Sequence, residues 1–132
     1  MALSNFQPLG WHTVTPRIIV DGAEKLVEFV KNVFGATGQY RAQAPAELQL
    51  GDSIIMISDA GARDPMPACL YVYVESADIT WQRAIDAGAQ SIESPLNTPY
   101  GDRRGMVTRR PACGRAGSQR RAYRWYQHCR NA

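Results

Sequence analysis

The chain reads Val20-Asp21-Gly22-Ala23-Glu24-Lys25-Leu26 and then Val33-Phe34-Gly35-Ala36, which is the pattern of a strand end, a helix start and a glycine stop. About 53 to 54 positions later the same order returns as Val74-Glu75-Ser76-Ala77-Asp78-Ile79 and Ala87-Gly88-Ala89. Self-similarity at a fixed period indicates two copies of one supersecondary unit. The sequence therefore predicts a duplicated α+β architecture, although it names no substrate.

Each copy is predicted to hold a strand, a helix and further strands. In the first copy, β-branched residues predict a strand over 13–20. Apolar residues at helical spacing then predict a helix that Asp21 caps and Gly35 ends. Strands follow at 38–43, 46–50 and 53–58. The second copy repeats this order, with Ser76 as the helix cap and strands at 69–74, 90–93 and 103–108. One more strand is due, and 122–128 alone has aromatic content suited to it.

Composition places the chain among ordinary globular proteins. Its 132 residues fit one domain, with 45% hydrophobic and 20% charged residues. No apolar run approaches the roughly 20 residues of a membrane span, and the first residues do not resemble a signal peptide. Cys69, Cys113 and Cys129 are odd in number and follow no metal-ligand spacing. We therefore expect a cytoplasmic protein without a structural disulfide.

The net charge of +3 conceals a sharp change at Thr108. Residues 1–108 hold 8 basic residues and all 12 acidic ones, whereas residues 109–132 hold 7 arginines and no acid. We therefore predict a domain over 1–108, with modules at about 13–58 and 69–108, and an atypical basic tail over 109–132. Our hypothesis for the tail is a shifted reading frame, because its composition changes abruptly. A genuine basic extension is the alternative, and translating the other two frames of the gene distinguishes them.

Two βαβββ modules in tandem resemble the vicinal oxygen chelate superfamily, the glyoxalase/bleomycin resistance/dioxygenase group, and especially its small single-domain bacterial members. The resemblance covers 13–108 and rests on several short stretches: Thr15-Pro16, Val20-Asp21-Gly22-Ala23, Phe34-Gly35-Ala36, Glu47-Leu48, Gly51-Asp52-Ser53, Leu70-Tyr71-Val72-Tyr73-Val74, Ala87-Gly88-Ala89 and Gly101-Asp102-Arg103. It implies a curled mixed sheet that encloses a ligand cup. It also implies an Asp-Pro-aromatic-Gly-Asn turn before the last strand. This chain has Arg109-Arg110-Pro111 there, so we expect that strand to be missing or replaced.

Metal-dependent members of this superfamily take His and Glu or Gln ligands from the first and last strand of each module. The residues that this chain offers there are not usual ligands of a divalent metal: they are Pro16, Arg17, Ile18, Ile54, Ile55, Met56, Tyr71, Val72 and Tyr73. His12 is the histidine nearest to such a strand, and a surface or loop role is its simpler interpretation. We therefore expect no cofactor, and a divalent metal only if the chain is an enzyme.

Eight residues are candidates for a ligand site in the cup. They are Arg17, Glu47, Gln49, Met56, Tyr71, Tyr73, Tyr100 and Arg103. Arg17 could bind a carboxylate or phosphate, and the two tyrosines of the 69–74 strand share a face and offer rings and hydroxyls. Solvated strand faces, core packing and exposed ion pairs are the simpler interpretations. Two histidines in these contexts build no catalytic triad, so we assign no catalytic residue.

Three functions agree with these residues. The first is a small-molecule binding protein of the glyoxalase/bleomycin-resistance type, without a catalytic metal and acting as a homodimer. The second is a metal-dependent lyase, isomerase or dioxygenase of the same superfamily, with its missing ligand in the last strand. The third is binding of a nucleic acid or another anionic partner through the tail, where Arg120, Arg121 and Arg124 lie among aromatic residues. We favour the first, because the cup-forming pattern persists while the metal ligands do not.

Overall fold

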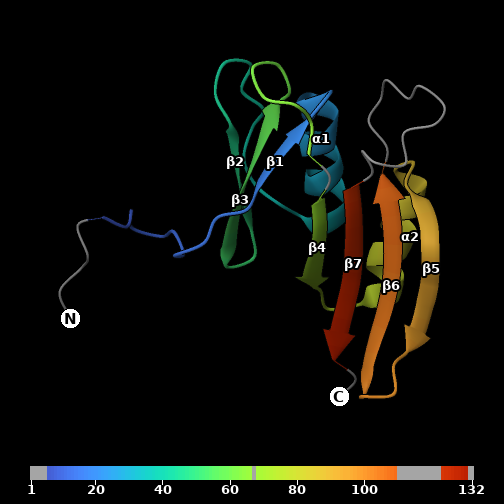
Figure 1. Cartoon of the computed structure of the whole chain (residues 1–132). Helices are drawn as coiled ribbons and strands as arrows, with labels where there is room; N and C mark the ends of the chain where they lie inside the picture. The colour runs from blue at the N-terminus through green and yellow to red at the C-terminus, as the bar shows by residue number, and fades with distance from the viewer. Residues whose placement is uncertain (1–5, 67, 110–122, 131–132) are drawn as a thin grey trace.

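The computed structural model of the chain describes residues 6–66, 68–109 and 123–130. In chain order its elements are β1 (Arg17–Val20), α1 (Ala23–Phe34), β2 (Ala46–Leu50), β3 (Ser53–Asp59), β4 (Ala68–Tyr73), α2 (Ala77–Asp86), β5 (Gln90–Asn97), β6 (Asp102–Arg109) and β7 (Tyr123–Arg130). They form an N-terminal sheet with the order β1-β3-β2 and a C-terminal sheet with the order β4-β7-β6-β5 (Figure 1). Within the described residues, neither helix is long and apolar enough to cross a membrane.

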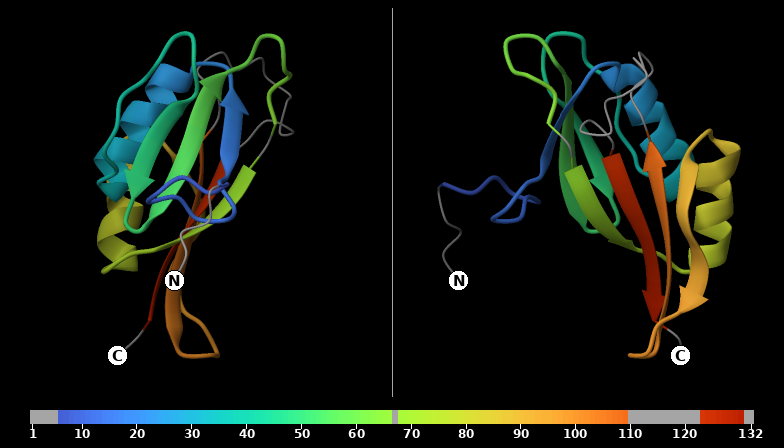
Figure 2. Two further views of the ribbon diagram at one scale, coloured as in Figure 1. Left: turned by 90° about the vertical axis from the view of Figure 1, so that its left-hand side faces the viewer. Right: turned by 45° about the vertical axis from the view of Figure 1, so that its right-hand side comes forward.

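The two modules are built alike, as the internal repeat predicted, except that the first sheet has three strands and the second has four. In each, the first strand pairs in parallel with the last, β1 with β3 and β4 with β7. The remaining neighbours are antiparallel. Helix α1 packs against the N-terminal sheet and α2 against the C-terminal sheet, and the helices also contact each other (Figure 2). The predicted α+β fold of tandem modules is confirmed.

The last strand of the second module, which we expected to be missing or replaced, is present as β7. It lies between β4 and β6 and pairs with both along its length. Its Trp125 is 1% exposed and belongs to the hydrophobic core. Trp125 is buried because it lies in register with Leu70 and Val107, on the side of the sheet that packs toward the helices. Part of the predicted tail therefore lies in the sheet, whereas residues 110–122 lie outside the described residues.

The first module contains three strands, because the strand predicted over 38–43 does not form. One isolated bridge, between Thr37 and Gln49, marks its start. Gly38 has a φ of 134°, and a Cβ atom there would lie 2.4 Å from the carbonyl oxygen of Glu47. The backbone thus passes β2 too closely for an ordinary residue. Tyr40 holds the segment by its side chain instead, since its hydroxyl donates to the Asp59 carboxylate.

The start of α1 differs from the prediction that Asp21 caps it. Gly22 occupies the N-cap position in a left-handed conformation, and as a glycine it has no side chain with which to cap the helix. Asp59, at the end of β3, accepts a hydrogen bond of 3.0 Å from the Ala23 N–H. The cap therefore comes from a neighbouring strand, which fixes α1 to its sheet. The prediction for α2 is confirmed, because the Ser76 hydroxyl accepts from the Ile79 N–H at 3.2 Å.

Candidate functional site

Four of the predicted site residues share the face of the N-terminal sheet that points away from α1. Register places Arg17 opposite Met56, and Met56 opposite Glu47, so the three stand in one row across the sheet. Gln49 lies two positions beyond Glu47 on the same face. The Arg17 Nε donates to the Ser58 hydroxyl at 3.3 Å, which orients the guanidinium along the sheet. This row, the sheet-face row, combines a cation, a thioether and a carboxylate.

The two predicted tyrosines lie together on β4. Tyr71 and Tyr73 are 55% and 69% exposed, and Val72 between them is buried, so both rings stand on the outer face of the strand. In register, the backbone of Tyr71 lies beside Tyr126 of β7 and that of Tyr73 beside His128. Two exposed rings on the edge strand of a sheet offer a surface on which a planar group could stack.

Arg104 on β6, which the sequence did not single out as a site residue, forms a polar cluster with Glu93 and Tyr100. Its guanidinium pairs with the Glu93 carboxylate of β5 at 3.2 Å and donates to the Tyr100 hydroxyl at 3.4 Å. Burial lowers the pKa of Arg104, but the hydrogen bond and charge of Glu93 outweigh that effect, and the net pKa is raised. Tyr100, a predicted candidate, therefore lies beside a cation that stays charged at all ordinary pH values.

The structure does not bring Arg103 into that cluster. Neighbouring residues of a strand project from opposite faces, so Arg103 points toward α2 while Arg104 points away from it. Its guanidinium donates to Asp78 at 2.6 and 2.9 Å and to the Asn97 side chain at 3.2 Å. The hydrogen bonding from Arg103 to the Asp78 carboxylate lowers the pKa of Asp78. Arg103 thus ties β6 to the first turn of α2.

No cluster of three or more His, Cys, Asp or Glu side chains with metal-binding geometry occurs in 6–66, 68–109 and 123–130. His12 is exposed, and it lies on the N-terminal segment before β1. His128 belongs to β7, the last strand of the second module, and its backbone lies in register with Tyr73 and Arg104. Its side chain is outside the described part of the structure. The row Arg17–Met56–Glu47 lacks the nitrogen or multiple carboxylate donors that a divalent metal prefers.

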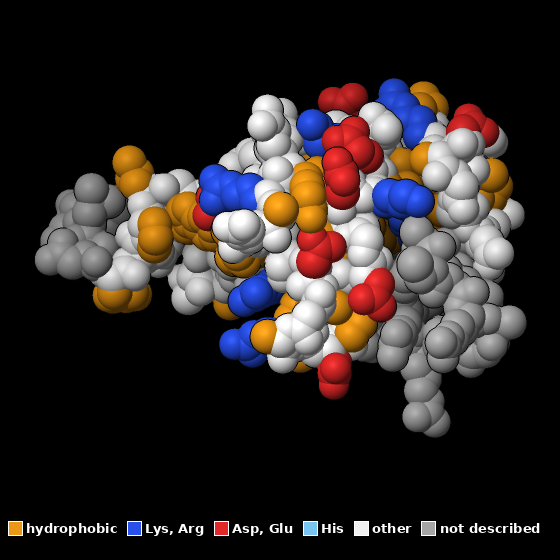
Figure 3. All heavy atoms as spheres, turned by 90° about the horizontal axis from the view of Figure 1, so that it is seen from above, with side chains coloured by type: hydrophobic (Ala, Val, Ile, Leu, Met, Phe, Trp, Pro, Cys, Tyr) orange, Lys and Arg blue, Asp and Glu red, His pale blue; other side chains and the backbone are white. Residues whose placement is uncertain are grey.

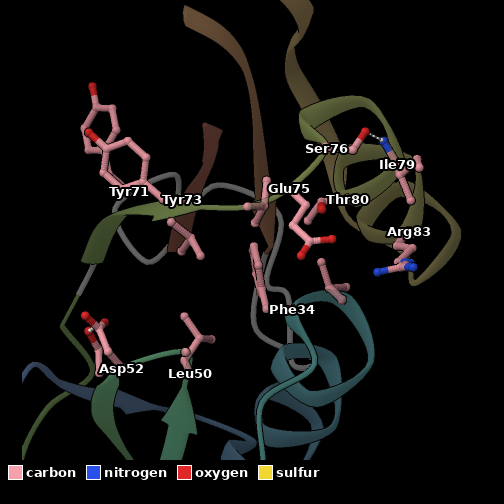
Figure 4. Close-up of a pocket in the computed structure, with 15 residues that line it drawn as sticks. Phe34, Leu50, Asp52, Tyr71, Tyr73, Glu75, Ser76, Ile79, Thr80 and Arg83 are labelled. Carbon is pink, nitrogen blue, oxygen red and sulfur yellow. Dashed lines mark hydrogen bonds between the residues drawn. The ribbon is translucent and has the colours of Figure 1, made fainter. Parts of the chain in front are cut away.

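A cavity of about 570 Å³ lies at one end of the junction between the two modules. The turn between β2 and β3 and the end of α1 form one side, and β4 and α2 form the other (Figure 4). Tyr71 and Tyr73 line it, but the other six predicted site residues do not. Its volume is typical of small-molecule sites. The sheet-face row therefore does not line this cavity, whereas the two tyrosines of β4 do.

Comparison with solved structures shows which fold this is. TioX from Micromonospora sp. ML1 superposes with a TM-score of 0.68 at 19% identity, covering 90% of this chain and 98% of that one. A glyoxalase/bleomycin resistance protein/dioxygenase family enzyme from Burkholderia phytofirmans PsJN gives 0.64 at 19% identity, covering 86% and 95%. The fold is that of the glyoxalase/bleomycin resistance/dioxygenase superfamily.

Other similar structures have the same fold at lower identity. The fosfomycin resistance protein FosX from Listeria monocytogenes gives a TM-score of 0.60 at 13% identity, covering 88% of this chain and 92% of that one. No protein-family model and no curated protein matches the sequence. At these identities the superpositions establish the vicinal oxygen chelate fold of the chain, and its activity must be argued from its own residues.

Sequence reasoning missed several residues that line the cavity, among them Asp52, Glu75 and Arg83. Each has an ordinary local explanation, since Asp52 lies in a turn and the other two flank or occupy α2. What joins them is the packing of one module against the other. Periodicity within a module carries no information on that packing, so no sequence signal pointed to this cavity. Arg120 and Arg121, proposed for an anionic partner, lie outside the described residues.

Proposed function

We propose that the chain is a small-molecule binding protein of the glyoxalase/bleomycin-resistance type that acts without a catalytic metal. The observation that supports this most is the sheet-face row of Arg17, Met56 and Glu47. Its Arg17 and Met56 lie on the first and last strands of the module, from which metal-dependent members draw their ligands, and Glu47 lies on the strand beside them. One guanidinium, one thioether and one carboxylate suit recognition of a polar organic molecule better than coordination of a divalent ion.

The expected ligand carries an unsaturated ring and a polar substituent. The exposed rings of Tyr71 and Tyr73 suit stacking on a planar group. Arg17 suits an anionic or carbonyl oxygen, and the Gln49 side chain, whose amide donates to the Gly51 carbonyl at 2.9 Å, keeps its oxygen for a donor group. These are binding contacts, and no proton transfer or covalent step is assigned to any of them.

The working unit of this proposal is a homodimer. β4 is an edge strand of its sheet, and edge strands pair readily with another chain. The segment before β1 also carries large exposed apolar side chains, with Phe6 87%, Leu9 86% and Val14 77% exposed. Figure 3 shows hydrophobic side chains along this segment, which projects from the body of the molecule. A second copy that covers these groups would remove them from water.

Metal analysis separates this proposal from the enzyme alternative. The purified chain is equilibrated with zinc, nickel, iron or manganese, freed of loose metal, and measured for bound metal and for glyoxalase activity. We expect less than stoichiometric metal and no activity above the uncatalysed rate. Stoichiometric metal together with turnover would establish the metal-dependent alternative instead.

Ligand binding is tested with a panel of planar organic acids and amides, followed by quenching of the intrinsic fluorescence. Tyr71→Ala and Tyr73→Ala are expected to weaken any hit by about tenfold, the loss expected for one stacked aromatic contact. Ile92→Ala, on the far strand β5, serves as the matched exposed control. A panel without hits, or equal losses in all three variants, would refute the proposed site.

A further inference from the structure

Two opposite charges lie at the cavity between the modules and take no part in the proposed cup site. Glu75 precedes the N-cap of α2, and Arg83 lies in its last turn. Within the described residues the ion pairs are Lys31–Glu28, Arg103–Asp78 and Arg104–Glu93, so neither charge belongs to one. Figure 4 shows the Glu75 carboxylate and the Arg83 guanidinium directed into the same end of the cavity.

The wall beside these charges is apolar. Val33 and Phe34 close the cavity at the end of α1, Leu50 adds the end of β2, and Ile79 adds the first turn of α2. Ile79 is 56% exposed, although such a side chain is more stable when covered. An occupant that places an apolar body over Phe34 and Ile79 would therefore gain from the hydrophobic effect.

One further charge faces the cavity, from the other module. Asp52 lies in the turn between β2 and β3, where it accepts a hydrogen bond of 3.0 Å from the Ser53 hydroxyl. Figure 4 places Asp52 on the opposite side of the cavity from Arg83. The lining thus has two carboxylates and one guanidinium. This arrangement favours a ligand that carries both an ammonium group and a carboxylate over one that carries an anion alone.

We propose that this cavity binds an apolar zwitterion of dipeptide size, with its carboxylate on Arg83 and its ammonium group on Glu75. Guanidinium–carboxylate pairs are directional and strong when they are bidentate, and an apolar ligand body over Phe34 and Ile79 would shield them from water. The volume of about 570 Å³ matches an organic ligand of this size. The charged residues of this site, Glu75 before α2 and Arg83 within it, differ from those of the sheet-face row, although Tyr71 and Tyr73 line the same cavity.

Chemical caps on one ligand test the two charges separately. Calorimetry with the full chain compares the dipeptide Leu-Phe with N-acetyl-Leu-Phe, which lacks the ammonium, and Leu-Phe amide, which lacks the carboxylate. We expect each cap to weaken binding by about tenfold or more, the loss of one charge-assisted hydrogen bond. If Leu-Phe does not bind at millimolar concentration, or if both capped forms bind as tightly, the proposal is wrong.

Charge-to-amide variants then assign each group. Glu75→Gln should remove the penalty of N-acetylation and leave that of amidation, and Arg83→Gln should do the reverse. Glu28→Gln and Arg63→Gln, matched exposed changes away from both the cavity and the sheet-face row, should leave dipeptide binding unchanged. If the control variants weaken dipeptide binding as much as the Glu75 and Arg83 variants do, the proposed zwitterion site is wrong. That outcome leaves the separate test of bound metal unaffected. All four positions are exposed, so circular dichroism is expected to show native folding throughout.

Discussion

The indole ring of Trp125 on β7 lies 5.3 Å, centroid to centroid, from the phenyl ring of Phe34 at the end of α1. The ring of Phe29, earlier in the same helix, lies 6.5 Å from the indole ring of Trp125, again centroid to centroid. A residue of the last strand thus packs against the first helix, and the two modules share one core. The folded body therefore depends on residues beyond the composition change at Thr108.

Truncation of this ring should destabilise the whole chain. Trp125→Ala removes a buried side chain that touches both modules, and such changes cost about 3–5 kcal/mol. Urea unfolding measures the loss, with Tyr100→Ala as the control because that ring is 63% exposed. The control should stay within about 1 kcal/mol of the unmodified protein. Equal stability of Trp125→Ala would show that β7 contributes nothing to the core.

Asp59 should stabilise α1 through its cap. Asp59→Ala removes the acceptor of the Ala23 N–H and should cost about 0.5–2 kcal/mol in the free energy of unfolding. Asp59→Asn keeps an acceptor at the same place and should retain most of that stability. Thermal or urea unfolding of the two variants measures their free energies of unfolding relative to the unmodified protein. An equal loss in both would mean that the charge, and not the cap, is what matters.

The same carboxylate should govern the titration of Tyr40. Its hydrogen bond with Asp59 stabilises the neutral phenol and raises the pKa of Tyr40. Because the pKa of the folded state is the higher one, this contribution to stability is present below the ordinary value of about 10 and is lost as pH rises through the raised pKa. Phenolate absorbance should contain a late-titrating component from Tyr40, and Asp59→Ala should move that component to lower pH. Identical titration curves for both proteins would contradict this.

The sequence predicted the modules better than it predicted their arrangement. The repeat of helix start and Gly-Ala stop was sufficient for α1, α2 and the strands beside them, because capping and periodicity act within a few residues. The predicted strand at 38–43 failed where Gly38 approaches β2 too closely to leave room for a side chain. That approach depends on Glu47 and Leu48, nine and ten positions away, which a local pattern does not contain.

The candidate site divides in the same way. Alternation along β2 and β4 put Glu47 with Gln49 and Tyr71 with Tyr73 on shared faces, and the structure agrees. The sequence singled out Arg103 and not Arg104, whereas these consecutive residues of β6 point to opposite sides and only Arg104 joins the cluster with Tyr100. Alternation predicts only that the two arginines face opposite ways, and the packing of β6 against α2, which a local pattern does not contain, decides which one faces the helix.

The pair of Asp78 and Arg103 should make stability depend on acid. The hydrogen bond from Arg103 lowers the pKa of Asp78, so the stabilisation is present above the ordinary carboxyl value of about 3.9 and is lost as pH falls through the lowered pKa. Arg103→Gln should raise the pKa of Asp78, which carboxyl chemical shifts report. The stability difference between the two proteins should vanish in acid. Arg63→Gln, in the exposed connector before β4, should leave the Asp78 titration unchanged.

The segment before β1 should hold the proposed dimer together. Phe6 and Leu9 are almost fully exposed in one copy, while the Gln7 side chain donates to the Trp11 carbonyl at 2.7 Å and gives the segment a local turn. Covering each apolar side chain stabilises an interface by about 1.5–3 kcal/mol, so Phe6→Ser with Leu9→Ser should weaken the dimer by about tenfold or more. Light scattering over a concentration series measures this, with Ile92→Ser on β5 as the control. If the unmodified chain is monomeric throughout the series, the dimer is wrong and the exposure of these side chains needs another partner.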